Sequence, residues 1–485
     1  MQQVSTVIGN EVGDRRPDLR MPEGLAIGTD GSLYVADVDN HHIGRLKDGE
    51  FETFAGLAGL LFRDGNGYPS GGFADGNRDT AMFRSPSAIA AGPDGSLYVA
   101  DSDNHSIRRI YPTGKVATLA GNGVIGSKDG MGEAASFQHP EGIAVSGDGT
   151  VYVADTLNHA IRRIKPDGTT TTLNAISSRV VEVYPGVVKK AGDYRDGDLS
   201  FALFNEPSGI AIDAKGNLFV SDTGNHRIRY IDLTLGTVVT VAGTSPKYKE
   251  DALYAQGGYK DGTSSQALFG SPQGIALDAK GGLVIADSMN HAIRYLRGGI
   301  VSTLAGNGVQ GVSGMRDGTE TSALFDTPQG VAIASDGTIY VADSGNDAIR
   351  RIVPYSLPAG ISYGDEIRVV LGQTVVSFDA KPRLVDARVM VPVRQIAEAL
   401  GYKVEFSEDG SKVLLSDDKV TIELNIGRKD IRRSEEGRAD FVKDMDVSPF
   451  ISKNRTFVPL RFFAEEIGLD VQWLGTQQAA ILRVR

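Results

Sequence analysis

One stretch of this chain, LYVADSDNHSIRRI at residues 97–110, decides the fold. Its first half is an apolar run that ends at Asp101, and its second half alternates apolar and charged residues, so each half is typical of a short strand. The Asp-Ser-Asp-Asn-His segment between them is typical of a tight turn, because Asp and Asn side chains hydrogen-bond nearby backbone amides. The stretch therefore predicts two antiparallel strands joined by a tight connection.

The same turn recurs six times, which indicates a repeat architecture. Each copy holds an Asp, two further residues, an Asn and, in all but the last copy, a His. The copies are Asp37/Asn40/His41, Asp101/Asn104/His105, Asp155/Asn158/His159, Asp222/Asn225/His226, Asp287/Asn290/His291 and Asp343/Asn346. A Pro-x-Gly-Ile-Ala-type strand precedes the turn and a Thr-Leu-Ala-Gly-type strand follows it. We name the four strands of each unit a to d, and four antiparallel strands make one blade of a β-propeller.

The sixth unit lacks a strand d of its own, because the chain runs from Ile352 into Pro354 and Pro358. The missing pattern stands at the other end of the chain as VSTVIG, residues 4–9. We therefore expect the N-terminal strand to complete the last blade and close a six-bladed ring, which removes the exposed strand edges at the seam.

The combined motifs resemble NHL repeats, and the resemblance covers about residues 3–355. It implies an all-β six-bladed propeller in residues 1–355. Propellers of this family act as scaffolds for protein, carbohydrate or RNA ligands, and a minority of their relatives are hydrolases or lyases.

Composition excludes several classes of function. The chain has no cysteine, so disulfides, zinc–thiolate sites and thiol nucleophiles are absent. Residues 1–360 hold 31 Lys and Arg against 41 Asp and Glu, and an acidic surface without a basic cluster argues against nucleic-acid binding. No stretch reaches the roughly 18 to 20 apolar residues of a membrane helix. Residues 1–25 contain no apolar signal core, so for an exported protein we expect the leader to be missing from this chain.

The repeated polar residues admit two interpretations. They could form a metal or catalytic ring, or they could hold the turns, with each His linking its blade to the next. We favour the structural role, because one substrate breaks sixfold symmetry and catalytic groups should therefore depart from the repeat. By the same argument we expect a set of repeated arginines to link neighbouring blades and a repeated phenylalanine to fill the gap between blades. The arginines are Arg108, Arg162, Arg229, Arg294 and Arg350; the phenylalanines are Phe83, Phe137, Phe204, Phe269 and Phe325.

Three enlarged connections from strand d to the next strand a are the predicted contact loops: residues 57–73, 174–194 and 244–259. The d-to-a and b-to-c connections of a propeller share one face, at the mouth of the central channel, and that face is the default binding surface. The aromatic residues of these loops suit protein or sugar surfaces, although they can equally hold their own loops in place. The candidate binding residues are Phe62, Arg63, Tyr68, Tyr184, Tyr194, Tyr248, Tyr254 and Tyr259.

Departures from the repeat on the same face add weaker candidates. These are His42, Gly44 in place of the usual arginine, and Asp347 in place of the usual histidine. We expect no cofactor and assign no catalytic or metal-binding residue. The alternatives are a structural calcium ion in the channel and a metal-dependent lyase or lactonase at its mouth, which would need oxygen or imidazole ligands from several blades.

The last 120 residues contain a different duplication. RVMVPVRQIAEALG at 388–401 is echoed by RTFVPLRFFAEEIG at 455–468. Each copy predicts a strand, a proline that opens a helix, and a glycine that ends it, so the region is a small α+β domain. The motif resembles the stalk domain named after the N-terminal region of copper amine oxidases, over residues 367–485, after a linker at 356–366. Amine oxidase activity is not implied, because the copper and the quinone belong to a separate catalytic domain. We expect the paired arginines, Arg388/Arg394 and Arg455/Arg461, to stabilise this fold.

That resemblance implies an exported protein of Gram-positive type, either extracellular or attached to the cell wall. The sequence therefore predicts a scaffold that presents the loop-bearing propeller face to a protein or glycan, with the C-terminal domain as an adhesion or spacing module. A purely structural envelope component remains open at this stage.

Overall fold

The structure is a computed structural model. It describes residues 2–9, 19–57, 70–244, 248–249, 252–308, 311–354, 366–372, 374–417, 420–435, 440–466, 469–474 and 478–484. The chain divides into two compact units, residues 1–355 and 356–485.

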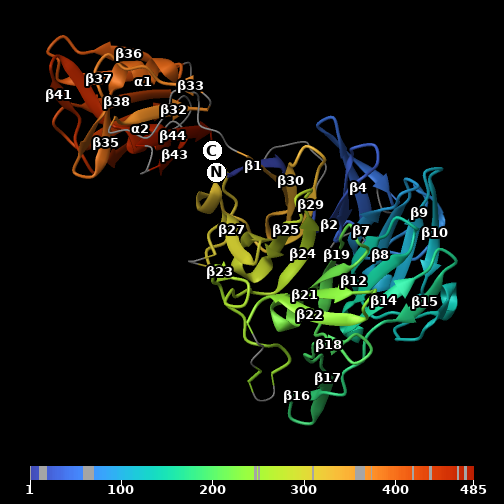
Figure 1. Cartoon of the computed structure of the whole chain (residues 1–485). Coiled ribbons are helices and arrows are strands. Elements are labelled where there is room, and N and C mark those ends of the chain that lie inside the picture. The colour runs from blue at the N-terminus through green and yellow to red at the C-terminus, as the bar shows by residue number, and fades with distance from the viewer. Residues whose placement is uncertain are drawn as a thin grey trace. The chain divides into compact units, whose positions relative to one another are not determined.

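The first unit is a six-bladed propeller, and Figure 1 shows its blades following one another in chain order. The innermost strands a are β2 (Pro22–Ile27), β7 (Pro86–Ala91), β12 (Pro140–Val145), β19 (Pro207–Ile212), β24 (Pro272–Leu277) and β29 (Pro328–Ile333). Strands b are β3 (Leu33–Asp37), β8 (Leu97–Asp101), β13 (Val151–Asp155), β20 (Leu218–Asp222), β25 (Leu283–Asp287) and β30 (Ile339–Asp343). Strands c are β4 (His42–Lys47), β9 (Ser106–Ile110), β14 (Ala160–Ile164), β21 (Arg227–Asp232), β26 (Ala292–Arg297) and β31 (Ala348–Pro354). Strands d are β5 (Glu50–Ala55), β10 (Lys115–Ala120), β15 (Thr169–Thr172), β22 (Thr237–Ala242), β27 (Ile300–Gly306) and β1 (Gln2–Ile8).

A fifth, two-residue strand pairs with strand d in blades 2 to 6. These short strands are β6 (Gly76–Asn77), β11 (Gly130–Met131), β18 (Gly197–Asp198), β23 (Gly262–Thr263) and β28 (Gly318–Thr319). Each one belongs to the d-to-a connection that leads into its own blade. The connection therefore wraps around the outer edge of the blade before strand a begins.

The N-terminal strand closes the ring, as predicted. β1 pairs antiparallel with β31, from Gln2 opposite Pro354 to Ile8 opposite Ile349, and Figure 1 shows the blue strand among the orange strands of the last blade. Val4 and Ile8 are buried there. Apolar burial and backbone pairing thus join the two ends of the propeller.

The repeated histidines link adjacent blades, which confirms the structural interpretation. The Nδ1 atom of each one accepts a hydrogen bond from the backbone N–H of the residue that precedes the strand-a proline of the next blade, at 2.8–3.3 Å. In the last blade the Oδ1 atom of Asp347 accepts the same bond from Met21, at 2.8 Å. Asp347 therefore takes the place of a histidine in the sixth of six equivalent contacts.

The repeated arginines act inside a blade, and the prediction that they link neighbouring blades is wrong. Arg108 is fully buried and donates to Asp101 of its own strand b at 2.6 Å and to Asp75 of its own d-to-a connection at 2.8 Å. Arg162, Arg229, Arg294 and Arg350 make the corresponding pairs. Both carboxylates belong to the blade of the arginine, because the connection pairs with strand d of that blade.

The repeated phenylalanines fill the gap between blades, as predicted. Phe83 is buried in a cluster that contains Ala26 and Tyr34 of blade 1 as well as Val99 and Val116 of blade 2. Phe137, Phe204, Phe269 and Phe325 are also fully buried. Each aromatic ring thus contributes apolar contact area across a blade interface.

The second unit is an α+β domain, and its described residues form three sheets and two short helices. One sheet contains β33 (Thr374–Val375), β32 (Arg368–Leu371), β44 (Ala479–Val484) and β43 (Leu469–Leu474); a second contains β34 (Arg383–Val385), β35 (Arg388–Pro392), β42 (Arg455–Pro459) and β41 (Phe450–Ser452). The third contains β36 (Lys403–Phe406), β37 (Lys412–Ser416), β38 (Val420–Asn425), β39 (Asp430–Glu435) and β40 (Phe441–Asp444), and the helices are α1 (Val393–Ala399) and α2 (Leu460–Glu466). The two copies of the duplicated motif meet where β35 pairs with β42, Val391 opposite Val458.

None of the helices in the described ranges is both long enough and apolar enough to span a membrane.

Candidate functional site

The central channel narrows where the six strands a begin. The residues after the strand-a prolines line a cavity of about 100 Å³ on the axis. Glycine permits this approach: a Cβ on Gly142 would lie 1.6 Å from the carbonyl oxygen of Ser208, and one on Gly330 would lie 1.8 Å from that of Glu23. The inner strands nearly touch there, and the residue that follows each strand-a proline is the one whose side chain faces the axis; in blade 2 Ala88 stands where the other blades have glycine.

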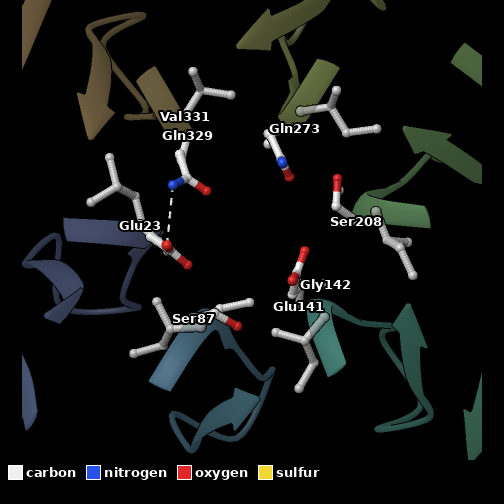
Figure 2. Close-up of a pocket in the computed structure, with 18 residues that line it drawn as sticks. Glu23, Ser87, Glu141, Gly142, Ser208, Gln273, Gln329 and Val331 are labelled. Carbon is white, nitrogen blue, oxygen red and sulfur yellow. Dashed lines mark hydrogen bonds between the residues drawn. The ribbon is translucent and has the colours of Figure 1, made fainter. Parts of the chain in front are cut away.

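These six residues, which we call the axial ring, differ from blade to blade. They are Glu23, Ser87, Glu141, Ser208, Gln273 and Gln329. Figure 2 shows them arranged around the axis, each from the start of a different strand. Two acids, two hydroxyls and two amides form an asymmetric polar lining inside a nearly symmetric fold.

Glu23 is the most perturbed member of the axial ring. Its carboxylate accepts a hydrogen bond from Nε2 of Gln329 at 3.1 Å. Burial, reinforced by the nearby carboxylates of Glu141 and Asp39, raises the pKa of Glu23 to about 8. At neutral pH this side chain is therefore mostly protonated and can donate as well as accept a hydrogen bond.

A second polar chain starts at Glu141. His139, two residues earlier, lies 3.0 Å from Glu141 through Nδ1 and 3.2 Å from Asp103 through Nε2. Hydrogen bonds to Asp103 and Glu141 raise the pKa of His139 to about 10, and the bond from His139 holds the pKa of Asp103 at about 2. The imidazolium thus bridges two carboxylates beside the axial ring.

Three of the candidate tyrosines hold their own loops. The ring of Tyr194 packs against Arg227 and Arg229, and that of Tyr259 against Arg294. Tyr248 packs against Arg179, which lies in the other insertion, and its hydroxyl bonds to Asn225. Arg179 also donates to the carbonyl oxygens of Ala252 and Leu253, each at 2.8 Å, so the insertions of blades 4 and 5 are joined.

Tyr254 and Tyr184 are the exposed tyrosines of these loops. Tyr254 is 46% exposed, and its hydroxyl lies 3.2 Å from Glu206, whose pKa is raised by burial. Tyr254 and Glu206 line a pocket of about 690 Å³ on the mouth face, together with His226, Gln273, Met289 and Asn290. Tyr184 is 73% exposed on the hairpin of β16 (Val180–Tyr184) and β17 (Val187–Lys190). Gln273 lines both this pocket and the axial cavity, so the two are neighbours.

The structure gives His42 and Gly44 structural surroundings, and three other candidates lie outside the residues it describes. His42 lies 3.2 Å from the buried Asp37, and burial lowers its pKa to about 4. The ring of Phe51 occupies the space beside Gly44 in which a larger side chain would lie. Phe62, Arg63 and Tyr68 lie outside the described residues.

Sequence reasoning missed the axial ring, His139 and Glu206. The signal was present in the residue after the proline of each strand a, which is Glu in two blades, Ser in two and Gln in two although its place in the repeat is constant. In the described part of the chain no group of three or more His, Asp or Glu residues is placed to hold a metal ion. The axial ring does contain carboxylate and amide oxygens, which calcium accepts as ligands, so the calcium ion stays a prediction.

Comparison with known proteins identifies both parts of the chain. NHL repeats match residues 19–46, 83–110, 137–164, 204–229, 269–294 and 325–352, and the copper amine oxidase N-terminal domain matches residues 369–482. Each NHL match covers strands a and b of one blade and all or part of its strand c.

Curated relatives share the propeller region. The chloroplastic protein SUPPRESSOR OF QUENCHING 1 of Arabidopsis thaliana is 35% identical over 214 residues, 42% of this chain and 18% of that protein. NHL repeat-containing protein 2 of Bos taurus is 30% identical, over 47% of this chain and 33% of its own length, and Teneurin-m of Drosophila melanogaster is 26% identical, over 69% and 12%. The chain thus spans a third or less of the length of each of these relatives.

Solved structures share the fold. An auxiliary nutrient binding protein from Bacteroides thetaiotaomicron superposes with a TM-score of 0.50 at 16% identity, over 73% of this chain and 76% of that one. A protein of unknown function from the same organism gives 0.51 at 18% identity, over the same shares.

Proposed function

We propose that this chain, an NHL-repeat β-propeller protein with a C-terminal copper amine oxidase N-terminal domain, is a binding scaffold whose propeller holds a protein or glycan ligand at the mouth of its channel. The C-terminal domain acts as its stalk, and the protein works outside the cell or on the cell wall. The observation that carries the binding role is the pocket of about 690 Å³ between blades 4 and 5, to which the insertion of blade 5 contributes Tyr254, Gly257 and Gly258.

The chemistry of that pocket suits a ligand with both apolar and polar groups. Tyr254 and Met289, which is 66% exposed, offer apolar surface, while Glu206, Gln273 and Asn290 offer hydrogen-bonding groups. Arg179 of the blade-4 insertion holds the backbone at Ala252 and Leu253, beside Tyr254, so this wall of the pocket is fixed before any ligand arrives. Such preorganisation reduces the entropy that binding would otherwise cost.

A glycan array and a pull-down with the full chain test this proposal, with Tyr254→Ala as the probe variant. We expect Tyr254→Ala to weaken the captured ligand about tenfold or more, as for an aromatic residue in the centre of an interface. The control is Leu235→Ala, because Leu235 is 74% exposed in a c-to-d turn on the opposite face. Equal binding by both variants would refute the mouth face as the binding surface.

A second candidate is a propeller enzyme, a metal-dependent lyase or lactonase. The chain Asp103–His139–Glu141 beside a glutamate with a pKa of about 8 favours it, because perturbed acids cluster where proton transfer occurs. Metal analysis of the purified protein separates the candidates: a stoichiometric ion that is lost together with a hydrolytic or lyase activity in Glu23→Gln favours the enzyme.

A further inference from the structure

The internal duplication of the C-terminal domain creates two equivalent pockets. One, the Arg394 pocket, is lined by Asp379, Pro392, Arg394, Gln395, Phe406 and Arg455 among others; the other, the Arg461 pocket, is lined by Asp446, Pro459, Arg461, Phe462 and Arg388. The pairs Asp379/Asp446, Arg394/Arg461 and Arg388/Arg455 are each 67 residues apart, which is the offset of the duplication. The equivalent aspartate–arginine pairs both form, since Arg455 bonds Asp379 at 2.5 Å and Arg388 bonds Asp446.

The Arg394 pocket is prepared for an anion. Its volume is about 410 Å³, within the range of small-ligand sites. The guanidinium of Arg394 lies 5.4 Å from the centre of the Phe406 ring and makes no hydrogen bond in the described part of the chain, so its donors are available. Arg455 uses Nε on Asp379 and one terminal nitrogen on the carbonyl oxygen of Asn454, which leaves its other terminal nitrogen available. Two arginines therefore face this pocket against one aspartate.

The same pocket offers two further contacts. The side-chain oxygen of Gln395 is buried in the wall and has no hydrogen-bond partner among the described residues. An unpaired buried acceptor costs free energy, and a ligand hydroxyl that reaches it would recover that cost. Phe406 is 39% exposed and gives the rim an apolar face. A negative group, a hydroxyl and an apolar ring face occur together in an acidic sugar.

The Arg461 pocket has the same frame but a different balance of charge. Arg388, Arg461 and Lys443 face Asp444, Asp446 and Glu465, so its positive and negative side chains are equal in number. Arg461 donates to the carbonyl oxygen of Val471 at 3.2 Å, and Phe462 replaces Gln395. The second pocket therefore lacks the free guanidinium, the excess positive charge and the unpaired acceptor of the first.

We propose that the Arg394 pocket binds an anionic sugar unit, with Arg394 and Arg455 holding its carboxylate or phosphate group and Gln395 accepting from a hydroxyl. Arginine binds either anion through two parallel hydrogen bonds, so the two share one recognition chemistry. This site belongs to the C-terminal domain alone and is independent of the ligand proposed for the propeller.

Calorimetric titration of the full chain tests the proposal with three probes: a galacturonic acid tetramer, galactose 6-phosphate and a neutral galactose tetramer. We expect one or both anionic probes to bind and the neutral tetramer not to bind. Arg394→Ala should weaken the binding about tenfold or more, because it removes charge-assisted hydrogen bonds. The affinity of Arg394→Lys should lie between those of the parent chain and Arg394→Ala, since lysine keeps the charge but loses the paired donors of the guanidinium.

The equivalent variant Arg461→Ala is the matched control and should change the affinity less than about twofold. Binding of the tetramer alone or of the phosphate alone supports the site and identifies which anion it takes. The proposal fails if neither anionic probe binds, if the neutral tetramer binds equally well, or if Arg461→Ala weakens binding as much as Arg394→Ala. If Arg394→Ala does not fold, Arg394→Lys and Arg455→Gln replace it in the comparison with Arg461→Ala, and both should weaken the binding more than Arg461→Ala does.

Discussion

Two sets of polar residues occur in every blade of the propeller, and they differ in how they are repeated. The turn network consists of the Asp at the end of strand b, the Asn three residues later and the buried Arg of strand c. It keeps its residue types in blades 2 to 6, and in blade 1 only the Arg differs, with Gly44 in its place. Its Asp–Asn bond measures 2.8–2.9 Å in all six blades, and its Arg–Asp bond measures 2.6–2.7 Å in blades 2 to 6. The axial ring changes residue type around the channel. In blades 2 to 6 the buried Asp and Arg of the first set neutralise each other, whereas Glu23 of the second set has no opposite charge in contact.

The difference shows how the same fold separates stability from recognition. A buried ion pair contributes little net stability but becomes very costly to break, so a network present in five of the six blades fixes their geometry. A buried acid without an opposite charge costs stability at neutral pH. Natural proteins accept such costs at functional sites, which is why the axial ring and not the turn network is the place to look for a ligand.

The turn network is tested most strongly by Arg350→Ala. Removal of this guanidinium leaves Asp343 buried without its cation and frees Asp317, which also bonds Thr6 of the closing strand. We expect the free energy of unfolding to fall by about 3 to 5 kcal/mol in urea denaturation. Arg351→Ala is the control, because Arg351 is the exposed neighbour on the same strand and should cost less than about 1 kcal/mol. Similar losses for both would show that the network is dispensable.

The axial ring is tested by Glu23→Gln and should respond in the opposite direction. The carboxyl has a pKa of about 8 in the folded protein and 4.5 as its ordinary value, so the folded state holds its proton more tightly than the unfolded state. Its contribution to stability is therefore complete below about pH 4.5 and is lost as the pH rises to about 8.

We expect Glu23→Gln to match the parent chain at pH 4 and to be more stable by about 2 to 4 kcal/mol at pH 8.5, as measured by denaturation across that range. The control is the exposed Glu133→Gln, which leaves the channel intact. If the free energy of unfolding varied with pH in the same way for the parent and Glu23→Gln, the raised pKa of Glu23 would be contradicted. The main contrast between the turn network and the axial ring would then be lost.

The propeller fold could be predicted from the sequence because the same strand and turn patterns recur in each blade. Apolar strands, Asp-Gly hairpins and the Asp-x-x-Asn turn predict the four-stranded blade. The displaced strand at residues 4–9 predicts how the ring closes. The arginines were misassigned for a physical reason. Sequence alone does not show that the connection carrying Asp75 returns to pair with strand d of its own blade through β6, and that pairing decides which blade each arginine serves.

The site was only partly accessible from the sequence. The mouth-face loops were found by their length, but which tyrosines are free depends on tertiary packing against Arg179, Arg227 and Arg294. One clue was available: Phe73, Tyr194 and Tyr259 all stand two residues before the Asp of their Asp-Gly pair, and a repeated position indicates a structural role. The axial ring could not be predicted from the sequence, because one variable residue inside a strand motif resembles ordinary sequence variation. Only the closed ring of blades shows that these six side chains face the axis.

Asp347 provides the smallest and most selective test, because it departs from the repeat yet makes the repeated contact. If its role is to accept the Met21 N–H, any good acceptor should serve, so Asp347→His restores the residue of the other five blades and should change the free energy of unfolding by less than about 0.5 kcal/mol. Asp347→Ala removes the acceptor and should cost about 1 kcal/mol, with water replacing part of the bond because Met21 is 40% exposed. Differential scanning calorimetry of both variants measures these shifts, and titration with the ligand captured by the parent chain accompanies it. Loss of ligand binding in Asp347→His without loss of stability would assign Asp347 to the recognition surface as well as to the contact between blades. A histidine preserves that contact but does not present a carboxylate to a ligand.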